Sequence, residues 1–207
     1  MAFYEVKHPL VAHKLGLLRD VNTPSSHFRE LCADLGSILF YEASRKLPLR
    51  KKTIKTPLEE TEVEELAVKN LILAPVLRAG LGMIPHIKSS YPEIKVAHIG
   101  IFRNEDTLKP ELYYLKLPRE IEDSVFYILD PMLATGGSLA YAVEKLKEHG
   151  AKKIVCLCII AAPEGVAYLE KSHPEIVIFA AALDRELNKH GFILPGLGDA
   201  GDRLFGT

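Results

Sequence analysis

One loop of the chain combines the residue types that suit a phosphate monoester. It consists of Asp130, Pro131, Met132, Leu133, Ala134, Thr135, Gly136, Gly137 and Ser138. The two glycines let the backbone approach an anion closely, and a helix that starts after them offers free N–H groups. Thr135 and Ser138 add hydroxyl donors, and Asp130 can accept hydrogen bonds from the vicinal hydroxyls of a ribose. A tight turn with a helix cap is the alternative, but the aspartate after an apolar run favours phosphate binding.

Two arginines follow other apolar runs of the chain. Arg78 comes after residues 71–76 and opens a turn of small residues, and Arg103 comes after residues 96–102. An arginine can hold a polyanion with two parallel hydrogen bonds. Each arginine alone fits a surface ion pair equally well. Together, beside a phosphate loop, they predict a clamp for pyrophosphate.

The C-terminal segment, residues 190–206, mixes glycines with apolar side chains. The apolar residues are Phe192, Ile193, Leu194, Leu197, Leu204 and Phe205. Glycines alone would indicate a flexible tail, whereas these side chains favour a packed irregular loop. Such a loop offers backbone N–H and C=O groups at fixed positions, which can read the edge of a small flat base.

Other site signatures are weak or absent from the sequence. There is no Walker A string, and the only approach to a dinucleotide fingerprint, residues 80–85, has Pro85 in place of the third glycine. The histidines are scattered without an H-x-x-x-H pair, so we expect structural or surface roles and single out only His190, beside the tail. Cys156 and Cys158 form an isolated C-x-C pair, and two buried small residues explain it better than a metal.

These groups need a scaffold, and the apolar pattern predicts a parallel α/β sheet. Short apolar runs without polar alternation cover residues 71–76, 96–102, 125–129, 154–161 and 176–181, and helical segments separate them. A helix is predicted over residues 138–149, ended by Gly150. Residues 112–117 look like one arm of an extended hairpin. Because ligands of open α/β sheets bind at the carboxyl ends of the strands, the loops after the strands are expected to meet there.

The first third of the chain is expected to be helical. Apolar residues recur at helical spacing in residues 26–47, and Ser25 or Ser26 can serve as the N-cap. The basic run at residues 45–52 fits a solvated surface better than a specific anion site.

Composition limits the classes of partner. The chain has 207 residues, 48% of them apolar, and a formal net charge of −1. That charge argues against nucleic acid as the main partner, because phosphate backbones select a strong positive excess. No apolar stretch approaches the ~18 residues that span a bilayer. The three cysteines give no disulfide framework. We therefore expect a cytoplasmic protein with no membrane and no nucleic-acid partner.

Several strings of the sequence resemble the uracil phosphoribosyltransferase family. They are PVLRAGLG (75–82), DPMLATGGS (130–138), AAPEG (161–165), PGLGDAGD (195–202) and FGT (205–207). The resemblance runs from about residue 5 to the C-terminus. The combination of the second and fourth strings is far more specific than a general phosphate loop.

The resemblance implies one domain over residues 1–207 with the type I phosphoribosyltransferase fold. This fold has a mainly parallel central sheet flanked by helices, with a small hood built from N- and C-terminal segments. The implied reaction of pyrimidine salvage joins uracil to phosphoribosyl pyrophosphate and gives UMP and pyrophosphate, with Mg²⁺. Residues 130–138 would hold the ribose and 5′-phosphate, Arg78 and Arg103 the pyrophosphate, and Ile193, Gly198, Asp199 and Ala200 the uracil. Asp199 would also face the donor.

One departure from the wider superfamily concerns the metal. Many phosphoribosyltransferase loops begin with two adjacent acidic residues, whereas Pro131 follows Asp130 here, as in the uracil-specific enzymes. We therefore expect Mg²⁺ to be carried mainly by phosphoribosyl pyrophosphate and predict no protein metal ligand.

Two other functions fit the same fold. A nucleotide- or RNA-binding regulator would need a basic face, and an enzyme for a purine or cytosine would need a different C-terminal segment. The family further implies a homodimer or a higher homo-oligomer. It also implies an allosteric response to GTP, and the basic run near Arg50 could form part of the GTP-binding site.

Overall fold

Short apolar runs form the strands of a single large sheet. The computed structural model describes residues 2–103 and 110–207, without the side chain of Arg103. The strands of the sheet are β1 (Ala2–Glu5), β4 (Asn70–Leu77), β5 (Lys95–Val96), β6 (His98–Arg103), β7 (Pro110–Lys116), β8 (Ser124–Leu129), β9 (Met132–Leu133), β10 (Lys153–Ala161) and β11 (Val177–Leu183). The main path runs β1-β11-β10-β8-β4-β6-β7, with β5 beside β4 and β9 beside β10. Its pairings are parallel, except that β7 runs antiparallel to β6.

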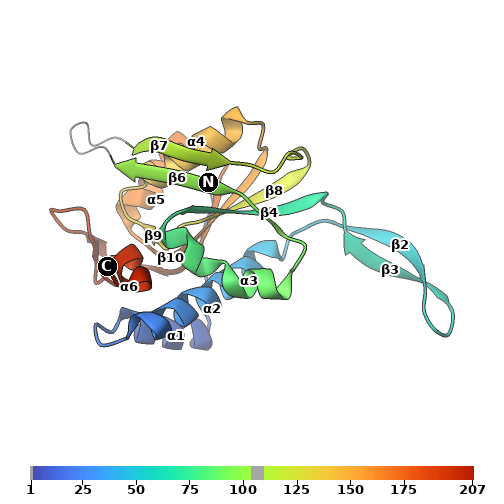
Figure 1. Cartoon of the computed structure of the whole chain (residues 1–207), viewed down its shortest axis with the longest axis horizontal. Helices are drawn as coiled ribbons and strands as arrows, with labels where there is room; N and C mark the ends of the chain where they lie inside the picture. The colour runs from blue at the N-terminus through green and yellow to red at the C-terminus, as the bar shows by residue number, and fades with distance from the viewer. Residues whose placement is uncertain (1, 104–109) are drawn as a thin grey trace.

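Helices cover both faces of this sheet. One face carries α1 (Pro9–Arg19), α2 (Ser25–Ser44), the 3₁₀ helix η1 (Ala79–Met83), α3 (Pro85–Ser90) and α6 (Ala200–Phe205), and the other carries α4 (Gly137–Glu148) and α5 (Pro163–Ser172) (Figure 1). Short strands β12 (Glu186–Leu187) and β13 (Ile193–Leu194) pair with each other near the C-terminus. Within the described part of the chain, no helix is both long and apolar enough to cross a membrane.

Alternate residues of the central strands enter two separate apolar clusters. In β8, Val125, Tyr127 and Leu129 pack toward α2, whereas Phe126 and Ile128 pack toward α4. Successive side chains of a strand point to opposite faces, so a sheet covered on both sides needs apolar residues at every position. This explains why the runs in the sequence lack polar alternation.

Most of the predicted elements are confirmed. The five apolar runs are β4, β6, β8, β10 and β11, and the predicted helices are α2 and α4. Gly150, with a φ of 93°, ends α4 and donates its N–H to the Lys147 carbonyl. β7 is the predicted antiparallel arm. Cys156 and Cys158 lie on one face of β10 and are buried in the same cluster, as expected.

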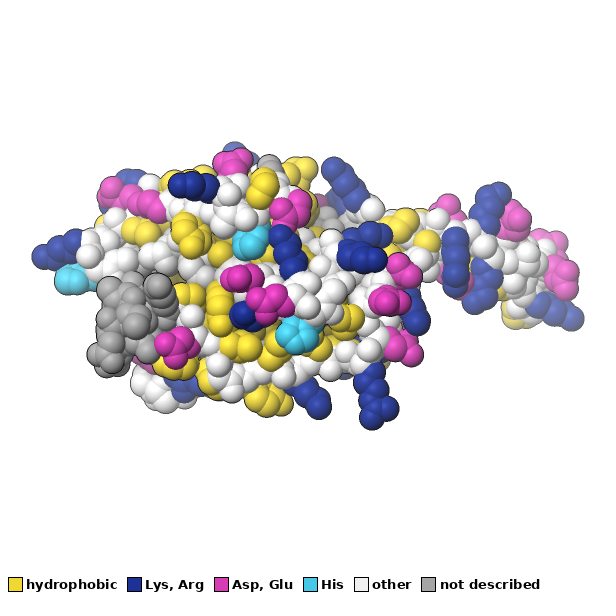
Figure 2. Space-filling view, turned by 90° about the horizontal axis from the view of Figure 1, so that it is seen from above, with side chains coloured by type: hydrophobic (Ala, Val, Ile, Leu, Met, Phe, Trp, Pro, Cys, Tyr) yellow, Lys and Arg dark blue, Asp and Glu magenta, His cyan; other side chains and the backbone are white. Residues whose placement is uncertain are grey.

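The prediction of a wholly helical first third is wrong. β1 joins the sheet, and β2 (Leu49–Lys55) pairs with β3 (Glu60–Leu66) in a hairpin that extends away from the body (Figure 1). Ion pairs link the two strands, such as Lys51 with Glu62 and Lys52 with Glu65, and charged side chains line the arm in Figure 2. The basic run did not indicate a hairpin, because the acidic residues that pair with it come later in the sequence.

The predicted N-cap of α2 is also wrong. Pro24 occupies the cap position without a side-chain cap, and its carbonyl accepts the N–H of Phe28 at 2.9 Å. Ser25 is therefore the first helical residue. The extended backbone of Pro24 already has the geometry that an N-cap residue requires.

Candidate active site

The predicted phosphate loop lies at the carboxyl end of β8. After Asp130 and Pro131, β9 and a short turn lead into α4, and the loop surrounds a hollow of about 90 Å³. Gly136 takes a φ of 84°, and a Cβ there would lie 2.9 Å from the Gly165 carbonyl oxygen. No side chain caps the first turn of α4. The N–H groups of the first turn of this helix, at Gly137 and Ser138, are therefore not used by a capping side chain and could bind an anion.

Asp130 has an unusual electrostatic position. It is half-buried, and its Oδ1 accepts a hydrogen bond of 3.3 Å from the Met132 N–H. Burial raises the pKa of this carboxyl to about 6, and the Met132 N–H offsets only part of the rise. The neighbouring thiols of Cys156 and Cys158 stay protonated and neutral, because burial raises their pKa. Donors from a ligand would favour the ionised carboxylate.

The Arg78 loop packs directly against the end of β8. Arg78 follows β4, after a cis Leu77–Arg78 peptide bond, and η1 begins at the next residue. A Cβ on Gly80 would lie 2.2 Å from the Leu129 carbonyl oxygen. Only glycine fits there, and Leu129 immediately precedes Asp130. This close contact brings the arginine loop and the phosphate loop together.

Arg103 is placed only by its backbone. It is the last residue of β6, which pairs with β4 in parallel, and it therefore lies at the carboxyl edge of the sheet. Its side chain is outside the part of the chain that the structure describes. The predicted contact of Arg103 with pyrophosphate stays a prediction.

The C-terminal segment is packed through Ile193, Leu197 and Leu204, as predicted, whereas Phe192 and Phe205 are exposed. Ile193 and Ala200 are both buried, so packing holds the backbone at these two positions. Asp199 accepts the Asp202 N–H at Oδ1, 2.9 Å away, and so caps α6. Gly198 takes a φ of 81° in the turn before that helix.

This segment closes on the other two loops. Leu204 of α6 fills the space beside Gly82 of η1, where a Cβ would lie 2.6 Å from Leu204 Cδ2. A Cβ on Gly191 would lie 3.8 Å from Thr135 Cγ2 of the phosphate loop. Three segments far apart in the sequence thus surround one region at the strand ends.

Some positioning residues were not identified from the sequence. Gly165 of the AAPEG string packs behind the phosphate loop, where a Cβ would lie 2.3 Å from the Ala134 carbonyl oxygen. Asp184 directly follows β11 and forms an ion pair with Arg19. The position of Asp184 after a buried strand, the same rule that singled out Asp130, could have revealed it. Nothing local in the sequence marks Arg19.

Known proteins resemble this chain over almost its whole length. The family model described as "Uracil phosphoribosyltransferase" matches residues 5–207. A protein of that name from Wolinella succinogenes is 48% identical over 207 residues, covering 100% of both chains. One from Lactococcus lactis is 51% identical over 207 residues, covering 99% of this chain and 98% of its own. A solved structure from Aquifex aeolicus superposes with a TM-score of 0.92 at 38% identity, covering 98% of this chain and 97% of that one.

Proposed function

The chain belongs to the uracil phosphoribosyltransferase family, and we propose how its three converging loops carry out the reaction of that family. The enzyme transfers the phosphoribosyl group of phosphoribosyl pyrophosphate to uracil, giving UMP and pyrophosphate in pyrimidine salvage. The fold is the α/β type I phosphoribosyltransferase fold. The observation that supports our assignment of the site is the packing of Gly80 against Leu129, which joins the Arg78 loop to the phosphate loop.

The donor's ribose phosphate occupies the loop after β8. Its 5′-phosphate lies at the N-terminus of α4, on the N–H groups and hydroxyls of residues 135–138, and Asp130 accepts from the ribose hydroxyls. Met132, Leu133 and Ala134 line the hollow that receives the donor, and Pro131 connects them to Asp130. These hydrogen bonds orient the C1′ carbon without any covalent attachment to the protein.

Pyrophosphate binds the two arginines at the ends of β4 and β6. Displacement at C1′ passes through an oxocarbenium-like state while negative charge grows on the leaving group. We place Arg78 and Arg103 where they neutralise that charge, and the Arg78 side chain is more than half exposed. No strong nucleophile is needed, so charge placement and orientation account for most of the catalysis.

Mg²⁺ fits this site as a companion of the substrate. Asp130 offers one carboxylate, and among the described residues no three His, Cys, Asp or Glu side chains gather to hold a metal. Mg²⁺ usually binds substrate phosphates with one or two carboxylates and several waters. When bound, it adds positive charge where the pyrophosphate leaves.

Uracil binds the C-terminal segment through backbone groups. Ile193 and Ala200 are buried, so packing holds their N–H and C=O groups in place. Gly198 has no side chain that would obstruct a flat ring. Asp199 lies between the base and the donor. We assign no group to the proton of uracil N1.

One domain and a hood complete the arrangement. We propose that residues 1–207 fold as one unit, in which the ends of α1 and the β12–α6 region cover the strand ends. Arg19 and Arg203 support this proposal, because both join α1 or the residue after it to the C-terminal segment. The three free, buried cysteines fit a reducing compartment, so we propose a cytoplasmic location.

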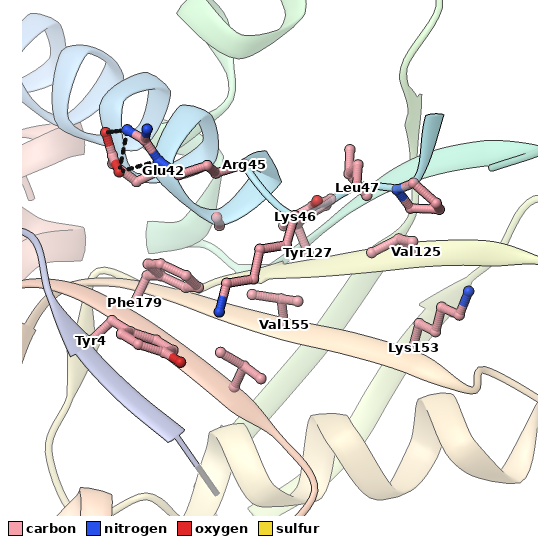
Figure 3. Close-up of a pocket in the computed structure, with 13 residues that line it drawn as sticks. Tyr4, Glu42, Arg45, Lys46, Leu47, Val125, Tyr127, Lys153, Val155 and Phe179 are labelled. Carbon is pink, nitrogen blue, oxygen red and sulfur yellow. Dashed lines mark hydrogen bonds and ion pairs between the residues drawn. The ribbon is translucent and has the colours of Figure 1, made fainter. Parts of the chain in front are cut away.

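A second copy of this chain is the proposed protein partner. All residues of β2 are exposed, and Leu58 at the tip of the hairpin is 95% exposed. An isolated two-stranded hairpin is only marginally stable in water. An apolar cavity of about 480 Å³ opens at the base of this hairpin, with Tyr4, Val155 and Phe179 among its lining residues (Figure 3). Two copies that exchange hairpins over these cavities would cover both surfaces.

GTP is the proposed effector, and its site would lie near the base of the same hairpin. Arg50, Lys69 and Lys153 line a polar hollow of about 400 Å³. Arg50 pairs with Glu65 and Lys69 with Glu120, so a triphosphate would have to replace these exposed ion pairs. Steady-state rates with and without GTP test this proposal; unchanged kinetics would contradict it.

Product analysis tests the main function. Purified protein, labelled uracil, phosphoribosyl pyrophosphate and Mg²⁺ should give UMP on chromatography, whereas cytosine, hypoxanthine and orotate should give no nucleotide. Nucleotide formed from another base instead would replace uracil as the substrate. No product from any base would favour the regulatory alternative, and salt-dependent RNA binding would then be measured.

A further inference from the structure

A buried ion pair holds the turn that precedes the proposed uracil-binding residues. Arg19, the last residue of α1, donates from Nη1 to Asp184 Oδ2 at 2.8 Å and from Nη2 to Asp184 Oδ1. The Asp184 side chain is only 3% exposed, and its residue follows β11 at the carboxyl edge of the sheet. Bidentate pairs of this kind fix geometry as well as charge.

Both members of the pair also bind Gly196. The Gly196 N–H donates to Asp184 Oδ2 at 2.9 Å, and its carbonyl accepts from Arg19 Nη1 at 2.6 Å. Gly196 takes a φ of 68°, and a Cβ there would lie 2.2 Å from the Ile193 carbonyl oxygen. Both backbone polar groups of Gly196 are therefore held by charged side chains, in a turn where only glycine fits.

Arg203 holds the next residues from the same side. Its Nη1 donates to the carbonyls of Leu18 and Leu197, each at 2.7 Å, and its guanidinium stacks 4.4 Å from the centre of the Phe28 ring. The C-terminal end of α1 is thereby joined to residues 196 and 197 by two arginines. The turn is positioned by α1, more than 150 residues away in sequence.

We propose that Arg19 and Asp184 are positioning residues that set the affinity for the nucleobase. This inference rests on the proposed function, in which backbone groups of residues 193 and 198–200 bind uracil. Backbone groups cannot adjust by changing rotamer, so their accuracy depends on what holds the turn, and a displacement of about 1 Å can cost on the order of a hundredfold in rate. The pair contacts Gly196, whereas most of the proposed donor contacts lie on the phosphate loop, Arg78 and Arg103, so the KM for the donor should depend on it much less than the KM for uracil.

Steady-state kinetics with both substrates varied test the proposal. In Asp184→Asn and Arg19→Gln, we expect the KM for uracil to rise about tenfold or more, while the KM for phosphoribosyl pyrophosphate changes less than about twofold. Arg19→Lys keeps the charge without the two-pronged contact and should give an intermediate KM for uracil. The double variant should be no worse than the more impaired single variant, because the two residues act as one unit.

Asp34→Asn is the matched control. Asp34 accepts an ion pair from Lys14 of α1, but it contacts α1 and α3 and not the C-terminal segment. It should lower thermal stability and leave the KM for uracil unchanged. If Asp184→Asn does not fold, Arg19→Lys and Arg19→Gln decide the question.

The outcomes separate this inference from the proposed function. Equal rises in both KM values, or a change in melting temperature alone, would overturn the positioning role. If the unmodified protein makes no UMP from uracil, the proposed function itself fails, before any variant is compared.

Discussion

Arg78 Nη2 lies 4.0 Å from Asp202 Oδ1, and the Arg78 guanidinium carbon lies 5.4 Å from the centre of the Phe205 ring. Arg78, the cation that we propose binds pyrophosphate, thus contacts α6, the helix that follows the proposed uracil-binding turn. Both partners of the ion pair are more than half exposed, at 58% and 57%, so the contact is worth little energy. Pyrophosphate can therefore take over the Arg78 side chain at small cost.

Replacing Arg78 by alanine tests the clamp. We expect kcat/KM for phosphoribosyl pyrophosphate to fall about 100-fold, because a positive charge beside the leaving group is lost. Arg119→Ala serves as the control, since this exposed arginine lies before β8 at the opposite end of the strand. Steady-state kinetics in which both variants retain equal activity would remove Arg78 from the proposed site.

Asp130→Asn should raise the free energy of unfolding and lower the activity. The folded pKa of Asp130 is raised to about 6 from 3.8, so the ionised carboxylate opposes folding. This cost is fully present above about pH 6 and disappears as the pH falls below about 4. We expect the variant to gain about 1–2 kcal/mol in unfolding free energy at pH 7.5, allowing for the partial exposure of the group, and to lose most activity.

Chemical unfolding at pH 7.5 and pH 4 checks this sign. The gain should be present at the higher pH and absent at the lower one. A stability gain of equal size at both pH values would mean that the charge of Asp130 is not the cause.

Two Gly→Ala substitutions should have opposite effects. At Gly80, a Cβ would lie 2.2 Å from the Leu129 carbonyl oxygen, so the loops must separate, at a cost of about 2–4 kcal/mol. At Gly16, in the exposed part of α1, nothing lies within 4 Å of the new Cβ, and alanine should stabilise the helix by about 0.5–1 kcal/mol. Thermal unfolding measures both changes.

Activity separates the two glycines further. Gly80→Ala should also weaken binding of phosphoribosyl pyrophosphate, because Arg78 moves with its loop, whereas Gly16→Ala should leave both KM values unchanged. Normal donor binding in a destabilised Gly80→Ala protein would argue against the role of this contact in aligning the loops.

Removing the hairpin tests the proposed self-association. Leu49 and Leu66 are paired across β2 and β3, so residues 50–65 can be replaced by a short glycine-containing turn without moving the ends of the chain. Light scattering after size-exclusion chromatography should report a smaller assembly than for the unmodified protein. A charge exchange, Lys51→Glu with Glu62→Lys, keeps this cross-strand pair and should keep the assembly. An unchanged mass after deletion would exclude the hairpin as the contact.

The sequence by itself determined the central strands, the loop that follows β8 and the family. Local patterns were sufficient there, because a strand covered on both faces must be apolar throughout, and the residues of an anion loop are contiguous. Asp130 and the glycines after it could be recognised as a unit for the same reason. The family strings added the reaction, which the family match bears out, and a predicted place for each substrate's contacts.

Only the tertiary structure decided how the separate segments support one another. Arg19 and Asp184 are 165 residues apart, and neither carries a local signal of the other. The β2–β3 hairpin was missed because its basic strand and its acidic strand each resemble a solvated charged segment, and only their pairing shows that the charges are complementary. The contacts of Gly80 and Gly165 depend on which carbonyl oxygen lies above them. Long-range packing creates these relationships, and a sequence pattern records only the residues that take part.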